Sequence, residues 1–264
     1  MGKEKIVSIE DRIPKLKQAR KKKANRRLIF YLSIFFFLVS IIVYLQTPLS
    51  HIKTITVNGN SFMSEEQVLT QSEISIGKNI WMVDLEASSN KLTENPIIKK
   101  VEVSRNLPWG ITIEVLEHEH VAYFERDNQY YPLLSNGTII STNEISTPDG
   151  YAPIMINFTE DEYLYRMTEE LNLLSTSILD LISEIHWNPS EGMKNKILLY
   201  MNDGFMVEGT IRGFSDKMNV YPSIVSQLEP DSKGIIHIGV GAYFESFDEN
   251  DMDEEAELDV EAEE

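Results

Sequence analysis

Two histidines in the segment His118-Glu119-His120 form the strongest candidate for metal binding in this chain. Residues two positions apart on a β-strand point to the same side, so the two imidazoles would share a face as potential zinc ligands. A zinc site needs at least a third ligand, and His51, His186 and His237 lie at spacings that predict none. We therefore interpret the pair as two exposed side chains at a strand end, and we expect no metal and no other cofactor.

Other catalytic signatures are missing from the sequence. The chain has no Cys, which excludes disulfides, thiol nucleophiles and thiolate metal sites. It contains no HExxH, GxSxG, Walker A or GxGxxG motif. Carboxylates are numerous, but no two of them stand out as a glycosidase pair. The sequence favours a non-enzymatic interaction protein, and a metal-dependent or wall-hydrolysing enzyme that uses His118 and His120 is the alternative.

Charge is distributed very unevenly along the 264 residues. The net charge is −18, from 24 Lys and Arg against 42 Asp and Glu. Residues 1–27 nevertheless carry 11 basic and 3 acidic residues, whereas 245–264 carry 12 acidic residues and no basic one. A chain this acidic does not fit a general nucleic-acid binder, which needs a basic face for phosphates. We expect the acidic segment 245–264 to be a disordered tail, because it has too few apolar residues to form a core.

An uncharged apolar run follows the basic segment and predicts a transmembrane helix over residues 28–46. At 1.5 Å per residue its length is close to the thickness of a bilayer core. The alternatives are a buried core helix and a cleaved signal peptide. Basic residues flank the run on its N-terminal side, which predicts a cytoplasmic segment 1–27 and an extracellular C-terminus. The basic residues nearest to the span are Lys21, Lys22, Lys23, Arg26 and Arg27.

Residues 50–118 carry the pattern of a small α+β domain. Apolar residues alternate with polar ones around Ile55, Val101 and Ile113, which predicts three half-buried strands. Between the first and second strands, Ser64-Glu65-Glu66-Gln67 reads as a capping box, and Asp84 as the N-cap of a second helix. The predicted order is β-α-α-β-β, with the helices covering one face of the sheet.

Residues 119–244 predict a second mixed α/β domain with a mainly β sheet. A capping box at Thr159-Glu160-Asp161-Glu162 predicts a helix that ends near residue 175, followed by a strand over Ile182–Trp187. A coiled coil continuing to Ile185 is the alternative. The remaining expected elements are strands at 121–124 and 130–134, a hairpin at Asn136-Gly137, a hairpin around Asn202-Asp203-Gly204, a helix over 215–228 and a final strand over 234–244.

Several motifs of the first domain together resemble the POTRA domain of the FtsQ/DivIB family. These motifs are Ile55-x-Val57-x-Gly59-Asn60, Gly77-Lys78-Asn79-Ile80, Pro96-x-Ile98-Lys99-x-Val101-x-Val103-x-Arg105-x-Leu107-Pro108 and Ile111-x-Ile113-x-Val115-x-Glu117. The basic N-terminus, single helix and acidic tail resemble the Gram-positive DivIB branch. The second domain resembles the distal β domain of the family more loosely, and His237 stands where the family commonly has Asp.

The resemblance implies a function that composition alone does not give. It implies a single-pass membrane scaffold at the division septum that joins the bitopic proteins FtsL and DivIC, the FtsB counterpart, and helps to stabilise or regulate septal peptidoglycan synthesis. A septal peptidoglycan synthase is a further possible partner, and a POTRA-type transport or receptor component is the other alternative. The final strand is a candidate edge for pairing with a partner segment. Its candidate contact residues are Ile235, Ile236, Ile238, Val240, Tyr243 and Phe244.

Overall fold

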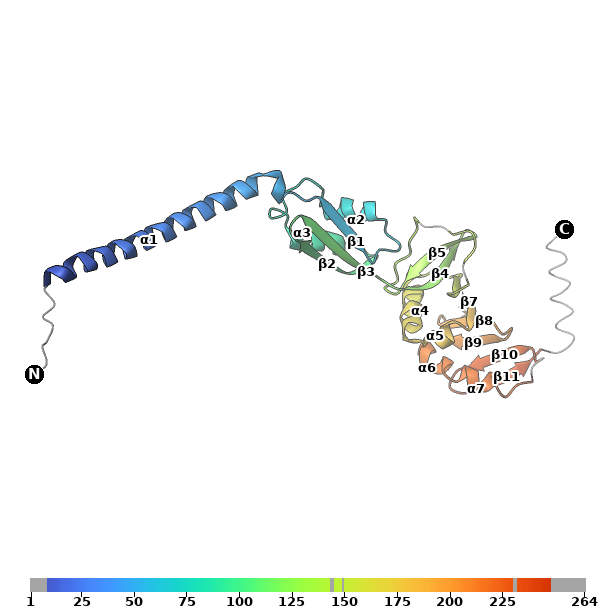
Figure 1. The fold of residues 1–264 in the computed structure, drawn as a ribbon. Helices are drawn as coiled ribbons and strands as arrows, with labels where there is room; N and C mark the ends of the chain where they lie inside the picture. The colour runs from blue at the N-terminus through green and yellow to red at the C-terminus, as the bar shows by residue number, and fades with distance from the viewer. Residues whose placement is uncertain (1–8, 143–144, 149, 230–231, 248–264) are drawn as a thin grey trace, which may run out of the picture. The chain divides into compact units, whose positions relative to one another are not determined.

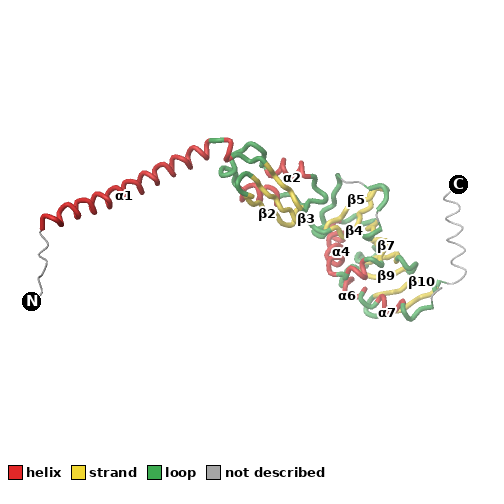
Figure 2. Tube along the Cα trace, in the orientation of Figure 1, coloured by secondary structure: helices red, strands yellow, loops and turns green. Residues whose placement is uncertain are grey.

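The computed structural model of the chain describes residues 9–142, 145–148, 150–229 and 232–247 (Figure 1). The protein is α+β, as predicted, and its elements divide between two compact units (Figure 2). The first unit runs to Glu94 and includes Lys100–Val115. The second unit contains Asn95–Lys99 and the chain from Leu116 onward.

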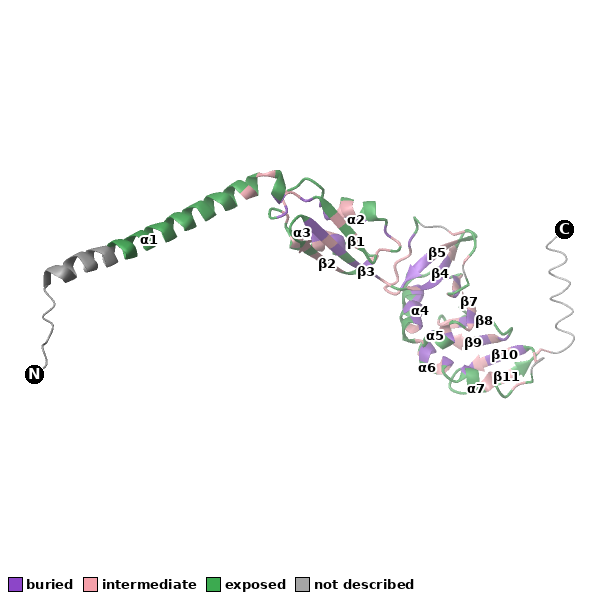
Figure 3. Ribbon diagram, in the orientation of Figure 1, coloured by how far each residue is buried: buried purple, intermediate pink, exposed green. Residues whose placement is uncertain are grey.

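The N-terminal helix α1 spans Ile9–Gln46, so it begins well before the predicted span of 28–46. Lys and Arg are good helix formers, which explains why the helix extends back into the basic segment. Its stretch Lys21–Gln46 is long and apolar enough to cross a membrane, and the side chains of this stretch are almost all exposed (Figure 3). The predicted apolar helix is therefore present, and it is not a core helix of the part of the chain that the structure describes.

Hydrogen bonds fix the end of α1 to the first unit. A short 3-10 helix, η1, spans Pro48–Ser50 directly after α1. The Ser50 hydroxyl donates to the Leu45 carbonyl at 3.1 Å, and Ser50 is fully buried. The Asn79 side-chain amide donates to the same Leu45 carbonyl at 2.7 Å and lies 3.0 Å from the Ser50 Oγ. A carbonyl that has no partner within its own helix is thus satisfied by a side chain of the folded domain.

The first unit contains the predicted β-α-α-β-β order. Its elements are β1 (Thr54–Asn58), α2 (Glu65–Ser72), α3 (Leu85–Thr93), β2 (Ile98–Asn106) and β3 (Gly110–Glu117). Strand β3 lies between β1 and β2, and β1 runs parallel to β3. Val68, Leu92, Ile111 and Ile113 are at most 1% exposed, so the two helices and the central strand supply the core.

Both predicted helix caps are present in the first unit. The Ser64 hydroxyl accepts from the Gln67 amide, and the Gln67 side chain accepts from the Ser64 amide, which is the reciprocal capping box. The Asp84 carboxylate accepts from the Ala87 amide at 3.0 Å at the start of α3. These caps fix where the two helices begin.

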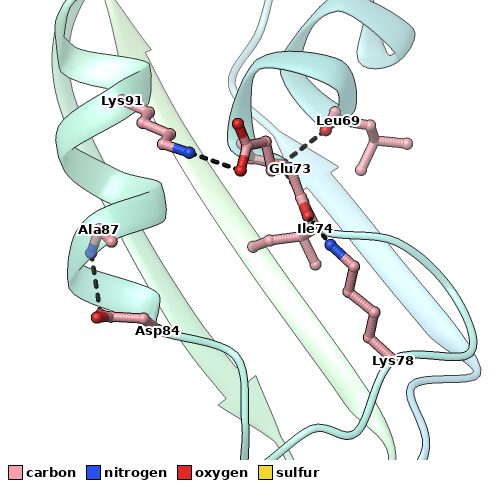
Figure 4. Close-up of polar contacts among 8 residues, drawn as sticks. Leu69, Glu73, Ile74, Lys78, Asp84, Ala87 and Lys91 are labelled. Atoms are coloured by element: carbon pink, nitrogen blue, oxygen red, sulfur yellow. Dashed lines mark hydrogen bonds and ion pairs between the residues drawn. The ribbon is translucent and has the colours of Figure 1, made fainter.

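Two lysines meet Glu73 at the C-terminal end of α2 (Figure 4). The Lys91 ammonium lies 2.5 Å from the Glu73 carboxylate, and the Lys78 ammonium donates to the Glu73 carbonyl at 2.7 Å. The hydrogen bond and positive charge of Lys91 hold the pKa of Glu73 below its ordinary value. Positive charge near the C-terminal end of α2 also interacts favourably with the negative end of its helix dipole. The Lys91 contact ties α2 to α3, and the Lys78 contact ties the end of α2 to the loop that follows it.

The described residues of the second unit form an eight-stranded sheet, in the order β11-β10-β9-β8-β7-β6-β4-β5. Strand β6 pairs in parallel with both β4 and β7, and β9 pairs in parallel with β10. The other pairings are antiparallel. Its elements are β4 (His120–Arg126), β5 (Gln129–Leu134), β6 (Ile154–Ile156), α4 (Asp161–Leu173), α5 (Thr176–Leu179), β7 (Ile182–Trp187), β8 (Lys196–Met201), β9 (Met206–Thr210), α6 (Phe214–Met218), α7 (Tyr221–Val225), β10 (Gly234–Ile238) and β11 (Ala242–Ser246).

A continuous apolar core joins the helices of this unit to its sheet. Helix α4 contributes Leu164, Met167 and Leu171, all at most 5% exposed. The Trp187 ring of β7 stacks on the Tyr163 ring of α4, with centroids 5.1 Å apart. Figure 3 marks buried residues on α4 and on strands of this sheet. The predicted strand over Ile182–Trp187 is confirmed, and its inward residues explain the apolar spacing that also suggested a coiled coil.

Two predictions for the second unit are wrong in detail, and the structure also excludes the coiled-coil alternative. Helix α4 begins at Asp161 after the N-cap Glu160, which makes no side-chain capping bond, so Thr159 does not form a capping box. The coiled coil is wrong, because α4 ends at Leu173 and β7 follows. The single helix over 215–228 is two short helices, α6 and α7. Pro222 has no amide to donate to the carbonyl of Met218, where α6 ends.

Glu170 supplies the cap that α6 lacks locally. Its carboxylate accepts from the Gly213 amide, the Ser215 amide and the Ser215 hydroxyl at 2.8–2.9 Å. We expect Glu170→Ala to lower the free energy of unfolding of the second unit by about 2 kcal/mol, because hydrogen bonds to a charged acceptor are lost. The measurement is urea unfolding followed by amide hydrogen exchange in β8 and β9. The control, Glu169→Ala, changes the neighbouring exposed carboxylate of the same helix and should have little effect. Equal losses in the two variants would contradict the capping role.

Candidate functional site

The predicted final strand over 234–244 is a hairpin of two strands, which changes the position of most of its candidate residues. Ile235, Ile236 and Ile238 lie on β10, between β9 and β11, so they are not on an edge. Ile236 and Ile238 are at most 5% exposed because they fill the core. Val240 lies in the turn, which the Gly239 amide closes by donating to the Gly241 carbonyl at 2.8 Å. Of the six candidates, Tyr243 and Phe244 alone lie on the edge strand β11.

The two edges of the eight-stranded sheet differ. Strand β5 is bordered by the loop after it, through bridges of Leu133 with Ile139 and of Tyr130 with Ile145. Its residue Pro132 also has no amide to offer. Strand β11 ends the sheet on the other side, and no residue in the described ranges pairs with its outer edge. The β11 edge is therefore the open edge of this sheet within the described part of the chain.

The alternation of an antiparallel pair shows which β11 backbone groups face outward. The Phe247 amide donates to the Lys233 carbonyl, and the Gly239 amide to the Gly241 carbonyl, so these two pairs are hydrogen-bonded ones. Hydrogen-bonded and non-hydrogen-bonded pairs alternate along such a ladder. The backbone groups of Tyr243 and Glu245 accordingly face β10, whereas those of Phe244 and Ser246 face the open edge. An extended partner segment would find its donors and acceptors at these two residues.

Charged and aromatic side chains form a ladder across the last four strands, which we call the edge ladder (Lys196, Glu208, His237, Tyr243 and Glu245). The Lys196 ammonium lies 2.8 Å from the Glu208 carboxylate, whose other oxygen lies 3.7 Å from the His237 Nδ1. The His237 Nε2 lies 2.9 Å from the Glu245 carboxylate, and its ring stacks on Tyr243 at 4.6 Å. The ladder holds the solvent-facing side of the hairpin in one arrangement.

Tyr243 and Phe244 point to opposite faces of the hairpin. The Tyr243 side chain is 62% exposed and lines a groove of about 400 Å³ together with Met193, Thr210 and members of the edge ladder. Phe244 packs against the core, with its ring 5.9 Å from that of Phe205. Tyr243 is therefore available as a contact residue, whereas Phe244 anchors β11 to its own domain.

The structure places the two candidate metal ligands, His118 and His120, around the start of β4. His118 lies between β3 and β4, and His120 is the first residue of β4; both are half-buried, not exposed as expected. The His118 Nδ1 lies 3.3 Å from the Ser135 hydroxyl. No group of three or more potential ligands occurs among the described residues.

The basic residues Lys21, Lys22, Lys23, Arg26 and Arg27 lie exposed on α1. The predicted tail lies outside the described residues except at its start, where Glu245 and Ser246 continue β11.

Comparisons with known proteins agree with both units. The family model described as "POTRA domain, FtsQ-type" matches residues 50–118, and "Cell division protein FtsQ/DivIB, C-terminal" matches residues 122–248. The chain is 46% identical to the cell division protein DivIB of Bacillus subtilis (strain 168) over 249 residues, which cover 94% of each chain. The chain belongs to the FtsQ/DivIB family of cell division proteins.

Other members of the family are similar over nearly their whole length. DivIB of Geobacillus kaustophilus is 38% identical, with 92% of this chain and 94% of that protein covered. DivIB of Listeria monocytogenes is 35% identical, with coverage of 95% and 93%. A solved structure of the major extracytoplasmic domain of DivIB from Geobacillus stearothermophilus is 32% identical, covers 44% of this chain and 97% of that one, and has a TM-score of 0.39. The resemblance drawn from the sequence motifs is confirmed.

The sequence alone does not reveal the edge ladder. Its members come from four strands, and only the register of those strands brings Glu208 opposite His237 and His237 opposite Tyr243. The signal that could have found it is the alternation in the last strands, where charged or aromatic residues occupy the solvent-facing positions of otherwise apolar runs.

His118 gives a prediction about pH. Burial, and then the positive charge of Lys99, lower the pKa of His118. The unfolded chain therefore binds more protons than the folded one just below the ordinary histidine pKa of about 6.5. Stability should fall as the pH drops through this range, and His118 should have no such effect above it. We expect His118→Asn to reduce the difference between urea midpoints at pH 5 and pH 7.5. A pH dependence unchanged from the parent protein would contradict this assignment.

Proposed function

We propose that this cell division protein is a non-enzymatic, single-pass scaffold that pairs the open edge of β11 with an extended segment of another division protein. The observation that carries the proposal is the difference between the two sheet edges. Strand β5 is bordered by its own loop, whereas no described residue borders the outer edge of β11. Backbone pairing supplies affinity, and side chains beside the edge supply specificity.

The side chains beside the edge fit such a partner. Tyr243 offers a large exposed ring, and aromatic residues contribute strongly to binding at protein interfaces. Glu208 and Glu245 add negative charge on the same face, held in place by Lys196 and His237. A partner strand with an apolar or basic side chain over the Tyr243 groove would complement this surface.

Family membership suggests which proteins supply that segment. The proposed partners are FtsL and DivIC, with the septal peptidoglycan synthase as a further one, and the proposed role is to stabilise or regulate septal peptidoglycan synthesis. The alternative of an enzyme based on His118 and His120 has no supporting observation in the described residues, where no third ligand joins them. The FtsQ/DivIB relatives likewise carry the name of cell division proteins.

Ser246→Pro tests the pairing directly. Proline removes an outward-facing amide, is tolerated on an edge strand, and leaves the amides that hold β11 to β10. We expect capture of FtsL and DivIC by the full-length chain to weaken about tenfold, the cost of one unsatisfied backbone group. The measurement is co-purification from membranes, with Ser246→Ala as the matched control that keeps the amide.

A second proline separates loss of pairing from loss of folding. Glu245→Pro removes an amide that faces β10, so it should disturb the hairpin, which amide hydrogen exchange in β10 detects. If Ser246→Pro bound both partners as well as Ser246→Ala, with β10 protected in each, strand pairing at this edge would be excluded. Deleting the chain after Lys233 is a poorer test, because it also removes Ile236 and Ile238 from the core.

The proposed topology places the N-terminus in the cytoplasm and both folded units outside. The support is the basic cluster before the apolar run, because Lys and Arg beside a membrane span are enriched on its cytoplasmic side. We expect exchange of Lys21, Lys22, Lys23, Arg26 and Arg27 for Glu to leave part of the protein inverted, as measured by protease accessibility of the second unit in spheroplasts. Exchange of the distant Lys3 and Lys5 for Glu is the control. Full accessibility in the cluster variant would contradict orientation by charge.

A further inference from the structure

Six large apolar side chains stand exposed at the end of the first unit where the chain leaves α1. We call them the apolar rim, and they are Leu49, Ile76, Trp81, Met82, Leu107 and Trp109. Met82 is 84% exposed, although its neighbour Ile80 is fully buried. Single exposed apolar residues are ordinary on protein surfaces, but a cluster at one end indicates an interaction surface.

Backbone hydrogen bonds bring the three pieces of the rim together around the segment 49–53. The Gly77 amide donates to the Ile52 carbonyl, and the Ile80 amide to the Ser50 carbonyl, both at 2.9 Å. The Lys53 amide donates to the Trp109 carbonyl, also at 2.9 Å. The loop after α2 and the turn between β2 and β3 therefore flank the segment that joins η1 to β1.

The rim lies close to the end of the apolar helix. Asn79 touches the carbonyl of Leu45, the last apolar residue of α1. The Trp81 amide donates to the Asn79 side chain at 2.9 Å, and the Met82 amide to the Asn79 carbonyl at 3.1 Å. A chain advances at most about 3.6 Å per residue, so Trp81 and Met82 cannot be far from Leu45. The polar layer on each side of a bilayer core is roughly 5 to 8 Å thick.

Cations accompany both tryptophans of the rim. The Lys53 ammonium lies 4.4 Å from the centre of the Trp109 ring, and the Arg105 guanidinium 5.9 Å from that of Trp81. Arg105 also donates to the carbonyls of Ile80 and Val83, at 2.9 and 2.8 Å, which fixes the loop that carries Trp81. Tryptophan with Lys or Arg is the composition that anchors proteins at membrane interfaces, where the ring meets the glycerol layer and the cation meets phosphate.

We propose that the apolar rim inserts into the lipid interface of the leaflet in which α1 ends, so that the first unit is seated on the membrane by its own surface as well as by its helix. The inference rests on the proposed anchoring by α1, because the rim's distance from lipid is set by Leu45. The occupant is the phospholipid glycerol and headgroup layer. A protein partner covering the rim is the competing occupant, and the experiment separates the two.

The absence of Cys allows the test to be made with single labels on the full-length chain. Met82→Cys, Glu114→Cys and Leu38→Cys each receive an environment-sensitive nitrobenzoxadiazole label in nanodiscs of phosphatidylcholine and phosphatidylglycerol. Glu114 is exposed on β3 opposite Asn58, at the other end of β1, and Leu38 lies within the apolar helix. Quenching by lipids with a nitroxide near the top of the acyl chain reports proximity to the interface.

We expect the label at 82 to be quenched several-fold more than the label at 114 and to emit at shorter wavelength. If the label at position 38 is quenched and the label at 82 behaves like the label at 114, the helix is in the bilayer but the rim is not. That result overturns the inference and leaves the proposed anchoring by α1 intact. If the label at 38 is not quenched either, the proposed anchoring itself fails. Protection of 82 in cells but not in nanodiscs would identify a protein as the occupant and would also overturn the inference.

Met82→Ser and Trp81→Ser in the otherwise native chain provide a second, label-free readout. Both side chains are exposed, so the fold should persist, as amide protection in β3 can show. Loss of interfacial seating should increase proteolysis in the loop 76–82 of nanodisc-embedded protein relative to Leu173→Ser, an exposed apolar position of the second unit. Equal cleavage of the three variants would count against the lipid contact.

Discussion

Backbone amides and carbonyls at the end of a helix or the edge of a sheet must find hydrogen-bond partners outside that element. This requirement applies both at the end of α1 and at the edges of the second sheet. At the end of α1, the Leu45 carbonyl has no hydrogen-bond donor within its own helix. The Asn79 side-chain amide and the Ser50 hydroxyl donate to it instead. Because Asn79 belongs to the loop between α2 and α3, the helix end and the folded domain share their hydrogen bonds. The same requirement operates on the second sheet, where one edge is bordered by its own loop and β11 is left with outward-facing groups among the described residues.

The sequence predicts the first unit well because its signals are local. Alternation around Val101 and Ile113 shows directly in the strands, and the caps at Ser64 and Asp84 need only the next three residues. The motif Gly77-Lys78-Asn79-Ile80 carried the family resemblance, but its physical use was not predictable. The Asn79 contact joins positions 34 residues apart, and no spacing rule reports it.

The second unit shows where local signals stop. The segment from Ile235 to Val240 looks like part of one strand, because Gly239 and Gly241 are also compatible with a bent strand. The structure instead pairs β10 with β9 on one side and with β11 on the other, and buries Ile236 and Ile238. Helix 215–228 fails at Pro222, where the apolar spacing continues but the backbone cannot. The edge ladder depends on register across four strands, so its residues could be seen in the sequence but not assembled from it.

The two proposed contact surfaces differ in chemistry, and the difference indicates what each can bind. The β11 edge presents backbone donors and acceptors at Phe244 and Ser246, and a hydrocarbon interior cannot satisfy such groups. An edge of this kind is suited to another peptide. The apolar rim offers its side chains, while its nearest backbone groups at Ile80 and Val83 are taken by Arg105 and at Ile52 by Gly77. A surface on which these three carbonyls are already bonded, with tryptophans beside cations, is suited to lipid, and it lies next to the helix that the bilayer would hold.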